Sequence, residues 1–365
     1  MIDTITDLQA LRRHILEWRR AGLRIGFVPT MGNLHAGHYS LVELARAHAD
    51  RVISSVFVNP TQFGPSEDFT RYPRTPEADT SGLEAAGCDA LWLPTVEGMY
   101  PFGIDLASNI RLPGVADVLE GVHRPGHFDG VCTVVARLFN QVQPDVAAFG
   151  KKDFQQLAVI AQMVTDLAYP LELLRGEIVR ESDGLAMSSR NQYLSPAERS
   201  TATVIHRTLR GMREEMLAGT ARLVVEARAG VELAEAGFEV DYTAVRTPDL
   251  VEPSAAPQVY AAPGRRVALI AARLGRTRLI DNIEFELPRP RREVRGATGR
   301  QRVQGGGRGP DRKVAGQVGE GTGHPLQVPG RPPARVEGAV VDADDVTGAA
   351  EGCRCSGLGR AEMAR

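Results

Sequence analysis

The chain has 365 residues, of which 43% are hydrophobic and 24% charged, and its formal net charge is −2. This length allows two domains with a sizeable core, and the near-neutral charge favours neither a nucleic-acid nor a membrane partner. No apolar run approaches the ~20 residues that a membrane-spanning helix needs.

The cysteines and the first residues bear on the cellular compartment. Cys88 and Cys132 lie in apolar surroundings typical of buried thiols, and the other two cysteines, at positions 353 and 355, complete no CxxC pair. Near the N-terminus, Asp3 and Asp7 stand where a secretory signal carries basic residues. We therefore expect a cytoplasmic protein.

Hydrophobic periodicity predicts helices and strands that alternate through the first half of the chain. The predicted strands occupy residues 24–28 (ended by Pro29), 51–58, 90–93, 145–149, 171–175 and 177–179. The predicted helices occupy residues 4–20, 39–49, 77–86, 131–142 and 154–167. Such alternation is typical of a parallel sheet in a Rossmann-like α/β domain, in which ligands bind beyond the carboxyl ends of the strands.

The pattern changes after residue 195. Long helices are predicted at residues 197–217 and 222–236, followed by strands at 238–245 and 267–272 and by one or two more within 277–287. We interpret this part as a smaller α+β domain that can close over the first. The sequence thus predicts a nucleotide-binding domain at residues 1–180 and a lid domain at residues 181–287.

Residues 288–365 form a tail of different composition. The tail contains no aromatic residue and is dense in Arg, Gly and Pro, as in RPRREVRG and GGGRGP. Since such a composition cannot bury a core, we expect the tail to be disordered. It is either a genuine extension or the translation of a GC-rich gene in the wrong reading frame.

The turn PTMGNLHAGH, residues 29–38, carries the strongest chemical signal. Gly32 and Gly37 leave room for a ligand to approach the backbone, and a helix that starts here presents free N–H groups to phosphate. His35 and His38 are three residues apart and would share one face of the first helical turn. A lone histidine near a helix start is more often a cap or a surface residue. The pattern His-x-Gly-His between a strand and a helix is more restrictive, and it resembles the HxGH signature of the nucleotidylyltransferase superfamily, in which both histidines contact the phosphates of ATP.

Two later segments also favour phosphate chemistry. Lys152 follows a predicted strand in GKKD, where a cation can neutralise charge on a departing pyrophosphate. In MSSR, the hydroxyls of Ser188 and Ser189 and the guanidinium of Arg190 suit contact with phosphate oxygens. Together with the histidines, these groups favour attack on the α-phosphate of ATP with release of pyrophosphate.

Six strings resemble, in order and spacing, those of the pantoate–β-alanine ligase (pantothenate synthetase) family. They are VPTMGNLHAGH, FVNPTQF, RYPRT, RPGHFDGV, PDVAAFGKKDFQQL and DGLAMSSRNQYLS. The resemblance extends over residues 1–287 and implies an ATP-dependent amide synthesis. In this reaction, pantoate attacks the α-phosphate to give pantoyl adenylate and pyrophosphate, and the amine of β-alanine then displaces AMP.

The resemblance also implies roles for individual residues. ATP would be bound by Met31, Gly32, Asn33, Leu34, His35, Ala36, Gly37, His38, Gly150, Lys151, Lys152, Asp153, Val179, Met187, Ser188, Ser189 and Arg190. Among these, His38 would act as proton donor and transition-state stabiliser, while His35, Lys152, Ser188, Ser189 and Arg190 would hold the phosphates. Gln62 would bind pantoate and β-alanine and Gln156 would bind pantoate, with Asn59, Tyr72 and His127 in the site wall.

Further expectations concern the metal and the partners. The family resemblance implies Mg²⁺ on the triphosphate, with Asp79 as a candidate ligand, and a homodimer without nucleic-acid or membrane partners. Lys151 departs from the family pattern, because many members carry an acidic residue at this position, and it adds charge beside the phosphate site.

Two other functions compete with the ligase interpretation. A nucleotidyltransferase would use the same first half-reaction but would keep the nucleotide on its product. A nucleic-acid-binding protein would work through the Arg/Gly-rich tail, although the tail lacks the aromatic residues on which bases stack.

Overall fold

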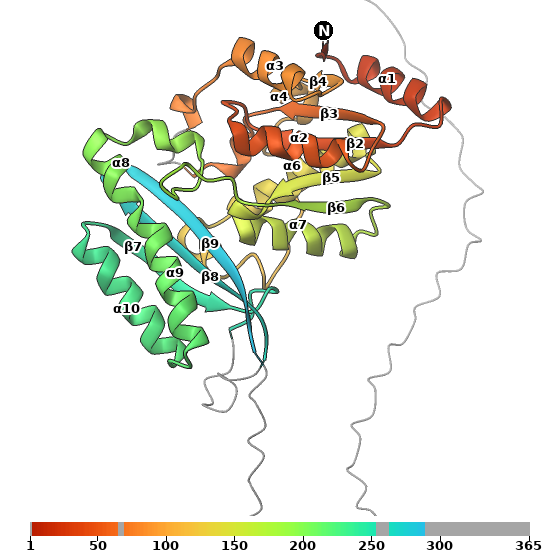
Figure 1. Ribbon diagram of the computed structural model, residues 1–365. Coiled ribbons are helices and arrows are strands. Elements are labelled where there is room, and N and C mark those ends of the chain that lie inside the picture. Colours follow the sequence, from red (N-terminus) through yellow and green to blue (C-terminus); the bar gives the residue numbers. More distant parts are fainter. Residues whose placement is uncertain (1, 65–68, 253–262, 289–365) are drawn as a thin grey trace, which may run out of the picture. The chain divides into compact units, whose positions relative to one another are not determined.

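The computed structural model describes residues 2–64, 69–252 and 263–288 (Figure 1). Apart from Pro288, the predicted disordered tail lies outside the described residues. Within the described ranges, the strands form two sheets, and helices pack against each of them.

The larger sheet has six strands, all of whose neighbouring pairs are parallel. In spatial order they are β1 (Asp3–Ile5), β4 (Ala90–Trp92), β3 (Arg51–Val56), β2 (Ile25–Thr30), β5 (Val146–Gly150) and β6 (Glu172–Gly176). The associated helices are α1 (Leu8–Arg20), α2 (Ala36–Arg46), α3 (Pro76–Ala85), α4 (Val96–Met99), α5 (Glu120–His123), α6 (His127–Val142) and α7 (Phe154–Asp166). The predicted Rossmann-like α/β class is confirmed.

Both faces of this sheet are covered, which explains why its central strands β2 and β5 are almost entirely apolar. Helices α1, α6 and α7 pack on one face, where Phe27 of β2 contributes to the core. Helices α2 and α3 pack on the other face, against Val28 of the same strand. Successive side chains of β2 thus enter opposite cores, because side chains alternate along a strand.

The smaller sheet is antiparallel, in the order β7 (Glu239–Arg246), β8 (Gly264–Leu274) and β9 (Thr277–Leu287). Helices α8 (Pro196–Ala202), α9 (Val204–Leu217) and α10 (Arg222–Glu235) precede it, and a core of residues such as Leu209, Leu233 and Ile270 joins α9 and α10 to the sheet. On its opposite face, Leu269 packs with Leu119 and Phe154 of the larger half. This α+β part agrees with the predicted class, while the exact boundary at residue 180 stays a prediction.

Several local predictions were wrong. The first helix was placed too early, because residues 3–5 form the edge strand β1 and Asp7 caps the helix by accepting the N–H groups of Gln9 and Ala10. Pro29 does not end β2, which continues to Thr30. The pairing of β2 with β5 stops at Phe27, so the N–H group that Pro29 lacks is not needed for a hydrogen bond to β5. Residues 177–179 form no strand, and the helix predicted over 197–217 is divided at Thr203 into α8 and α9.

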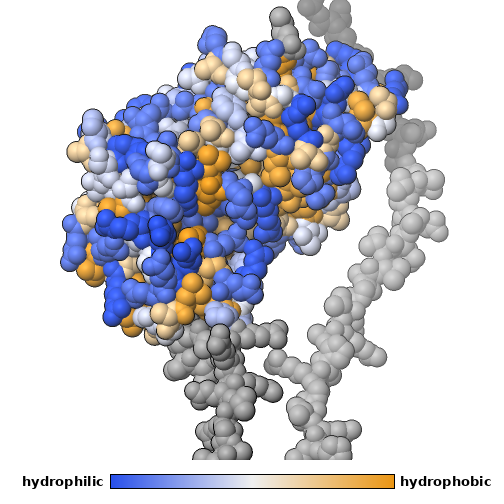
Figure 2. Space-filling view, in the orientation of Figure 1, coloured by the Kyte–Doolittle hydropathy of each residue, from blue (hydrophilic) through white to orange (hydrophobic). Residues whose placement is uncertain are grey.

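The surface carries the usual mixture of residue types. The face seen in Figure 2 is mostly hydrophilic, with smaller groups of hydrophobic residues between the polar ones. In the described part of the chain, every helix is too short or too polar to cross a bilayer.

Candidate active site

The strand order sets the position of the site. Strand β2 lies between β3 and β5, so the chain winds outward in opposite directions from the β2–β5 pair. In parallel sheets, ligands bind beyond the carboxyl ends of the strands at such a switch point. The histidine-bearing turn follows β2 and the GKKD turn follows β5, so both phosphate-binding candidates flank this point.

Asp79 of α3 holds the histidine-bearing turn in shape. Its carboxylate accepts the N–H groups of Asn33 at 2.9 Å and Leu34 at 2.8 Å, and the hydroxyl of Thr75 at 3.0 Å. Gly32 has a φ of 83°, and a Cβ there would lie 3.0 Å from the same carboxylate, so glycine is required on both counts. No local pattern in the sequence indicated this role for Asp79.

The expected contribution of Asp79 to Mg²⁺ binding does not fit this arrangement. The side chain is 2% exposed, and both its oxygens already accept hydrogen bonds from protein donors. Among the described residues, no group of three His, Cys, Asp or Glu side chains is placed to hold a metal ion. Both carboxylate oxygens of Asp79 are thus used to hold the histidine-bearing turn in shape.

The two histidines are held by backbone N–H groups at their Nδ1 atoms. His35 is the N-cap of α2, and its Nδ1 accepts the N–H of Gly37 at 3.1 Å. His38 lies three residues later, and its Nδ1 accepts the N–H of His35 at 3.3 Å. Because each Nδ1 is an acceptor, the proton of each neutral ring is on Nε2. The rings lie with centroids 4.1 Å apart, so the turn presents two neighbouring Nε2–H donors.

Both imidazoles are uncharged at neutral pH. Burial, followed by the charge of Lys152, lowers the pKa of His35 from 6.5 to about 4. Burial, followed by the neighbouring His35 and then Lys152, lowers the pKa of His38 to about 3. The histidines can therefore donate hydrogen bonds to phosphate, but they are not imidazolium acids at neutral pH.

These two histidines should make the protein less stable in acid. An unfolded chain binds protons at both rings below pH 6.5, whereas the folded protein binds them only near pH 4 and pH 3. Since the unfolded state holds more protons in this window, the free energy of unfolding falls as the pH drops from 6.5. Urea unfolding of His35→Gln/His38→Gln should show a flatter slope between pH 6.5 and pH 4. An unchanged slope would place the acid-sensitive groups elsewhere.

The two lysines of the GKKD turn have different surroundings. Residues Lys151–Asp153 form the short helix η3, capped by Gly150 at the end of β5. The ammonium of Lys151 pairs with Glu177 and, at 3.1 Å, with Glu284 of β9. For Lys152 we find no ion pair within the described residues, and it lines the cavity. The extra charge expected from Lys151 is thus neutralised, and Lys152 supplies the available cation.

The MSSR segment lies against the histidine-bearing turn. Ser189 begins the short helix η4 (Ser189–Tyr193), and its hydroxyl donates to the carbonyl oxygen of Asn33 at 2.9 Å. Met187 donates its N–H to the carbonyl oxygen of Val179 at 3.0 Å, and Val179 approaches Gly37. Segments predicted to bind ATP from three parts of the sequence therefore meet at one place.

A cavity of about 630 Å³ extends between the two sheets. Its wall includes the predicted site residues His127, Lys152, Asp153, Gln156, Ser188 and Arg190. Among the described residues, the cavity wall does not include the two HxGH histidines, Asn59, Gln62 or Tyr72. Tyr72 is buried instead against Phe63, with ring centroids 5.8 Å apart.

Asn59 and Gln62 form a buried polar group beside Met31. The amide of Asn59 donates to Oε1 of Gln62 at 3.3 Å and accepts the hydroxyl of Tyr100 at 2.7 Å. The amide of Gln62 donates to the sulfur of Met31 at 2.9 Å. Asn59 is therefore saturated by protein partners and positions Gln62. Substrate binding by Gln62 stays a prediction.

Arg124, which follows α5, and His127, the first residue of α6, contact the same group. His127 Nδ1 and Arg124 each donate to the backbone carbonyl of Gln62, at 2.8 Å and 3.5 Å. A Cβ at Gly130 would lie 2.4 Å from the carbonyl oxygen of Thr61, so only glycine allows this close approach. Arg124 was not predicted as a site residue, although it stands in the string RPGHFDG.

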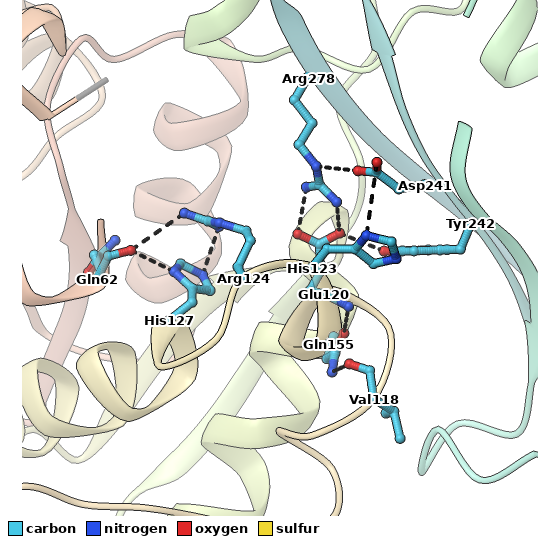
Figure 3. A network of polar contacts seen from close by, with 10 residues as sticks. All are labelled: Gln62, Val118, Glu120, His123, Arg124, His127, Gln155, Asp241, Tyr242 and Arg278. Atoms are coloured by element: carbon cyan, nitrogen blue, oxygen red, sulfur yellow. Dashed lines mark hydrogen bonds and ion pairs between the residues drawn. The ribbon is translucent and has the colours of Figure 1, made fainter. Parts of the chain in front are cut away.

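A charged network ties this loop to the smaller sheet (Figure 3). Glu120 of α5 accepts both terminal N–H groups of Arg278 at 2.7 Å and the hydroxyl of Tyr242 at 2.8 Å. Arg278 also donates to Asp241 at 2.7 Å. The contacts with Arg278 keep the pKa of Glu120 below its usual value although burial opposes this. On the other side, Gln155 accepts the N–H of Glu120 at 2.9 Å, which fixes α5 to α7.

The chain is similar in sequence to proteins of one family. A family model described as pantoate-beta-alanine ligase matches residues 3–284. A pantothenate synthetase of Xanthomonas campestris pv. campestris (strain B100) is 70% identical over 285 residues, which are 78% of this chain and 100% of the relative.

Solved structures agree with these matches. The crystal structure of pantothenate synthetase from Thermus thermophilus shares 45% identity with a TM-score of 0.69, covering 77% of this chain and 99% of that one. A pantoate-beta-alanine ligase from Francisella tularensis, complexed with beta-gamma ATP and beta-alanine, shares 29% identity with a TM-score of 0.65, covering 78% and 97%. The chain therefore belongs to the pantoate–β-alanine ligase family.

Proposed function

We propose that this protein condenses pantoate with β-alanine to pantothenate, consuming ATP and releasing AMP and pyrophosphate. The observation that carries this proposal is the arrangement of two Nε2–H donors, the ammonium of Lys152 and the MSSR segment around the switch point of the sheet. Membership of the family supports the identity of the two substrates.

In the first half-reaction, a carboxylate oxygen of pantoate attacks the α-phosphate and pyrophosphate leaves. Negative charge develops on the phosphate oxygens, and His35, His38 and Lys152 donate to them without prior rearrangement, because the turn already orients both rings. His38 acts here as a neutral hydrogen-bond donor rather than as an acid. Mg²⁺ carried on the triphosphate would neutralise further phosphate charge, since this ion is commonly held through substrate phosphates.

In the second half-reaction, the free amine of β-alanine attacks the acyl carbon of pantoyl adenylate and AMP leaves. Gln156 in the cavity wall and Gln62, whose amide contacts the sulfur of Met31, bind the polar groups of pantoate. Ser188, Ser189 and Arg190 hold the phosphates of ATP and then the phosphate of the adenylate. The family resemblance further supports a homodimer that works in the cytoplasm.

Exchange of labelled pyrophosphate into ATP tests this proposal. Exchange should require pantoate but not β-alanine, because formation of the adenylate is a separate reversible step. Adding β-alanine should then release one AMP for each pantothenate formed. Exchange that begins only with β-alanine would contradict the two-step mechanism, and a product that retains the nucleotide would indicate a nucleotidyltransferase.

A further inference from the structure

Strand β9 of the smaller sheet uses its two faces differently. Leu279, Ile283 and Leu287 belong to, or pack on, the core of the smaller α+β part. Residues of the alternate parity, Arg278, Asn282 and Glu284, contact residues of the larger half. Because side chains alternate along a strand, one face of β9 stabilises its own domain while the other reaches the phosphate-binding turn.

Asn282 makes the most direct of these contacts. Its side-chain amide donates to the carbonyl oxygen of Lys151 at 2.8 Å and to that of Lys152 at 3.0 Å. The residue is 2% exposed, so both hydrogen bonds are shielded from water and replacement would leave two carbonyl groups without this donor. One amide thus fixes two consecutive peptide groups of η3.

Asn282 is itself held firmly. Its backbone N–H donates to the carboxylate of Asp281 at 2.7 Å, and its carbonyl oxygen accepts Arg180 at 3.2 Å. Arg180 also forms a two-pronged ion pair with Asp281, at 2.6 Å and 3.0 Å. Since Asp281 is buried, this pair anchors β9 beside the segment that leads to MSSR.

The same face of β9 also separates the roles of the two lysines. Glu284, two residues beyond Asn282, pairs with the ammonium of Lys151. This ion pair neutralises the ammonium of Lys151. Asn282 instead orients the backbone of Lys152, whose side chain lines the cavity.

We propose that Asn282 is a positioning residue for adenylation, which acts by orienting the Lys152 ammonium toward the phosphates. This inference rests on the proposed function. Asn282 lines the cavity, but its amide donates to the carbonyl oxygens of Lys151 and Lys152. In this scheme its whole effect on ATP therefore passes through Lys152. Small displacements of a group that stabilises a transition state have large effects on rate, so Asn282→Ala should lower pantoate-dependent pyrophosphate exchange by about 10-fold, chiefly in kcat.

A double-mutant cycle in the full-length protein tests whether the effect passes through Lys152. Exchange is measured for the wild type, Asn282→Ala, Lys152→Ala and the double variant. We expect Asn282→Ala to lower the wild-type rate by about 10-fold and the Lys152→Ala rate by less than about 2-fold. Ile283→Ala is the matched control, because it shortens the next residue of the same strand on the core side. Its effect on exchange should be the same in both backgrounds.

Three results would overturn the inference. An equal loss in both backgrounds would mean that Asn282 acts on the fold in general, and thermal unfolding of each variant would identify this cause. Normal exchange in a folded Asn282→Ala would mean that η3 needs no support from β9. Normal exchange in Lys152→Ala would refute the role of Lys152 in the proposed function as well, which distinguishes the two failures.

Discussion

Replacing His38 with alanine should lower kcat by about 10² to 10³, because loss of one donor to a charged transition state costs ~3 kcal/mol. The ring of His38 is one of two neighbouring Nε2–H donors at the switch point, and its orientation is set by the N–H of His35. Since the interaction strengthens as charge develops, KM for pantoate should change much less than kcat. Steady-state kinetics with pantoate, β-alanine and ATP measure both constants.

His48→Ala is the matched control for this variant. His48 follows α2 and is exposed, with its Nδ1 atom near the carbonyl oxygen of Leu44, so its replacement should leave kcat within about 2-fold of the wild type. Near-normal turnover in a folded His38→Ala would remove His38 from the reaction. A comparable loss in His48→Ala would mean that α2, rather than the donor, had been damaged.

Replacing Arg278 with methionine should destabilise the protein by about 3–5 kcal/mol, because it leaves a buried carboxylate without its partner. Glu120 is 6% exposed and accepts two hydrogen bonds from Arg278. Tyr242 also donates to Glu120 but is neutral, and the nearby charge of Arg124 is a smaller influence on Glu120 than the contacts with Arg278. Denaturant unfolding at pH 7 measures the change.

The variant Arg278→Met/Glu120→Gln should recover part of this loss, because the charge that lost its partner is removed with it. The control is Arg207→Met, since Arg207 pairs with Glu232 at 3.1 Å on an exposed surface and should contribute about 1 kcal/mol or less. If Arg278→Met were no more destabilising than Arg207→Met, the network in Figure 3 would not secure the smaller sheet.

Local patterns in the sequence were sufficient for the architecture of the larger sheet. Strands such as β2 are apolar throughout because both faces are covered, and helices with one apolar side lie between them. Parallel strands separated by helices place their carboxyl ends at one edge. This is why His38 and Lys152 could be expected at a common site although more than a hundred residues separate them.

Local signals also misled where a cap or a tertiary contact decided the outcome. The edge strand β1 has only three residues, so its pairing with β4 is visible only once β4 is in place. The histidines were expected within the first turn of a helix, but His35 is the N-cap, which turns both Nδ1 atoms toward backbone N–H groups. The tautomers followed only from that geometry.

The sequence alone determined the fold class, the family and the groups that carry phosphate chemistry, because these depend on short-range patterns of residue types. Only the tertiary structure decided which residues hold those groups in place. Asp79, Glu120 and Asn282 act across long separations in the chain, on Asn33, Arg278 and Lys152 respectively. A polar residue inside an apolar strand, as in TRLIDNIEF, indicates that its side chain has a hydrogen-bond partner in the folded protein. Which residue is that partner depends on how the two sheets pack, and no local spacing in the sequence encodes this.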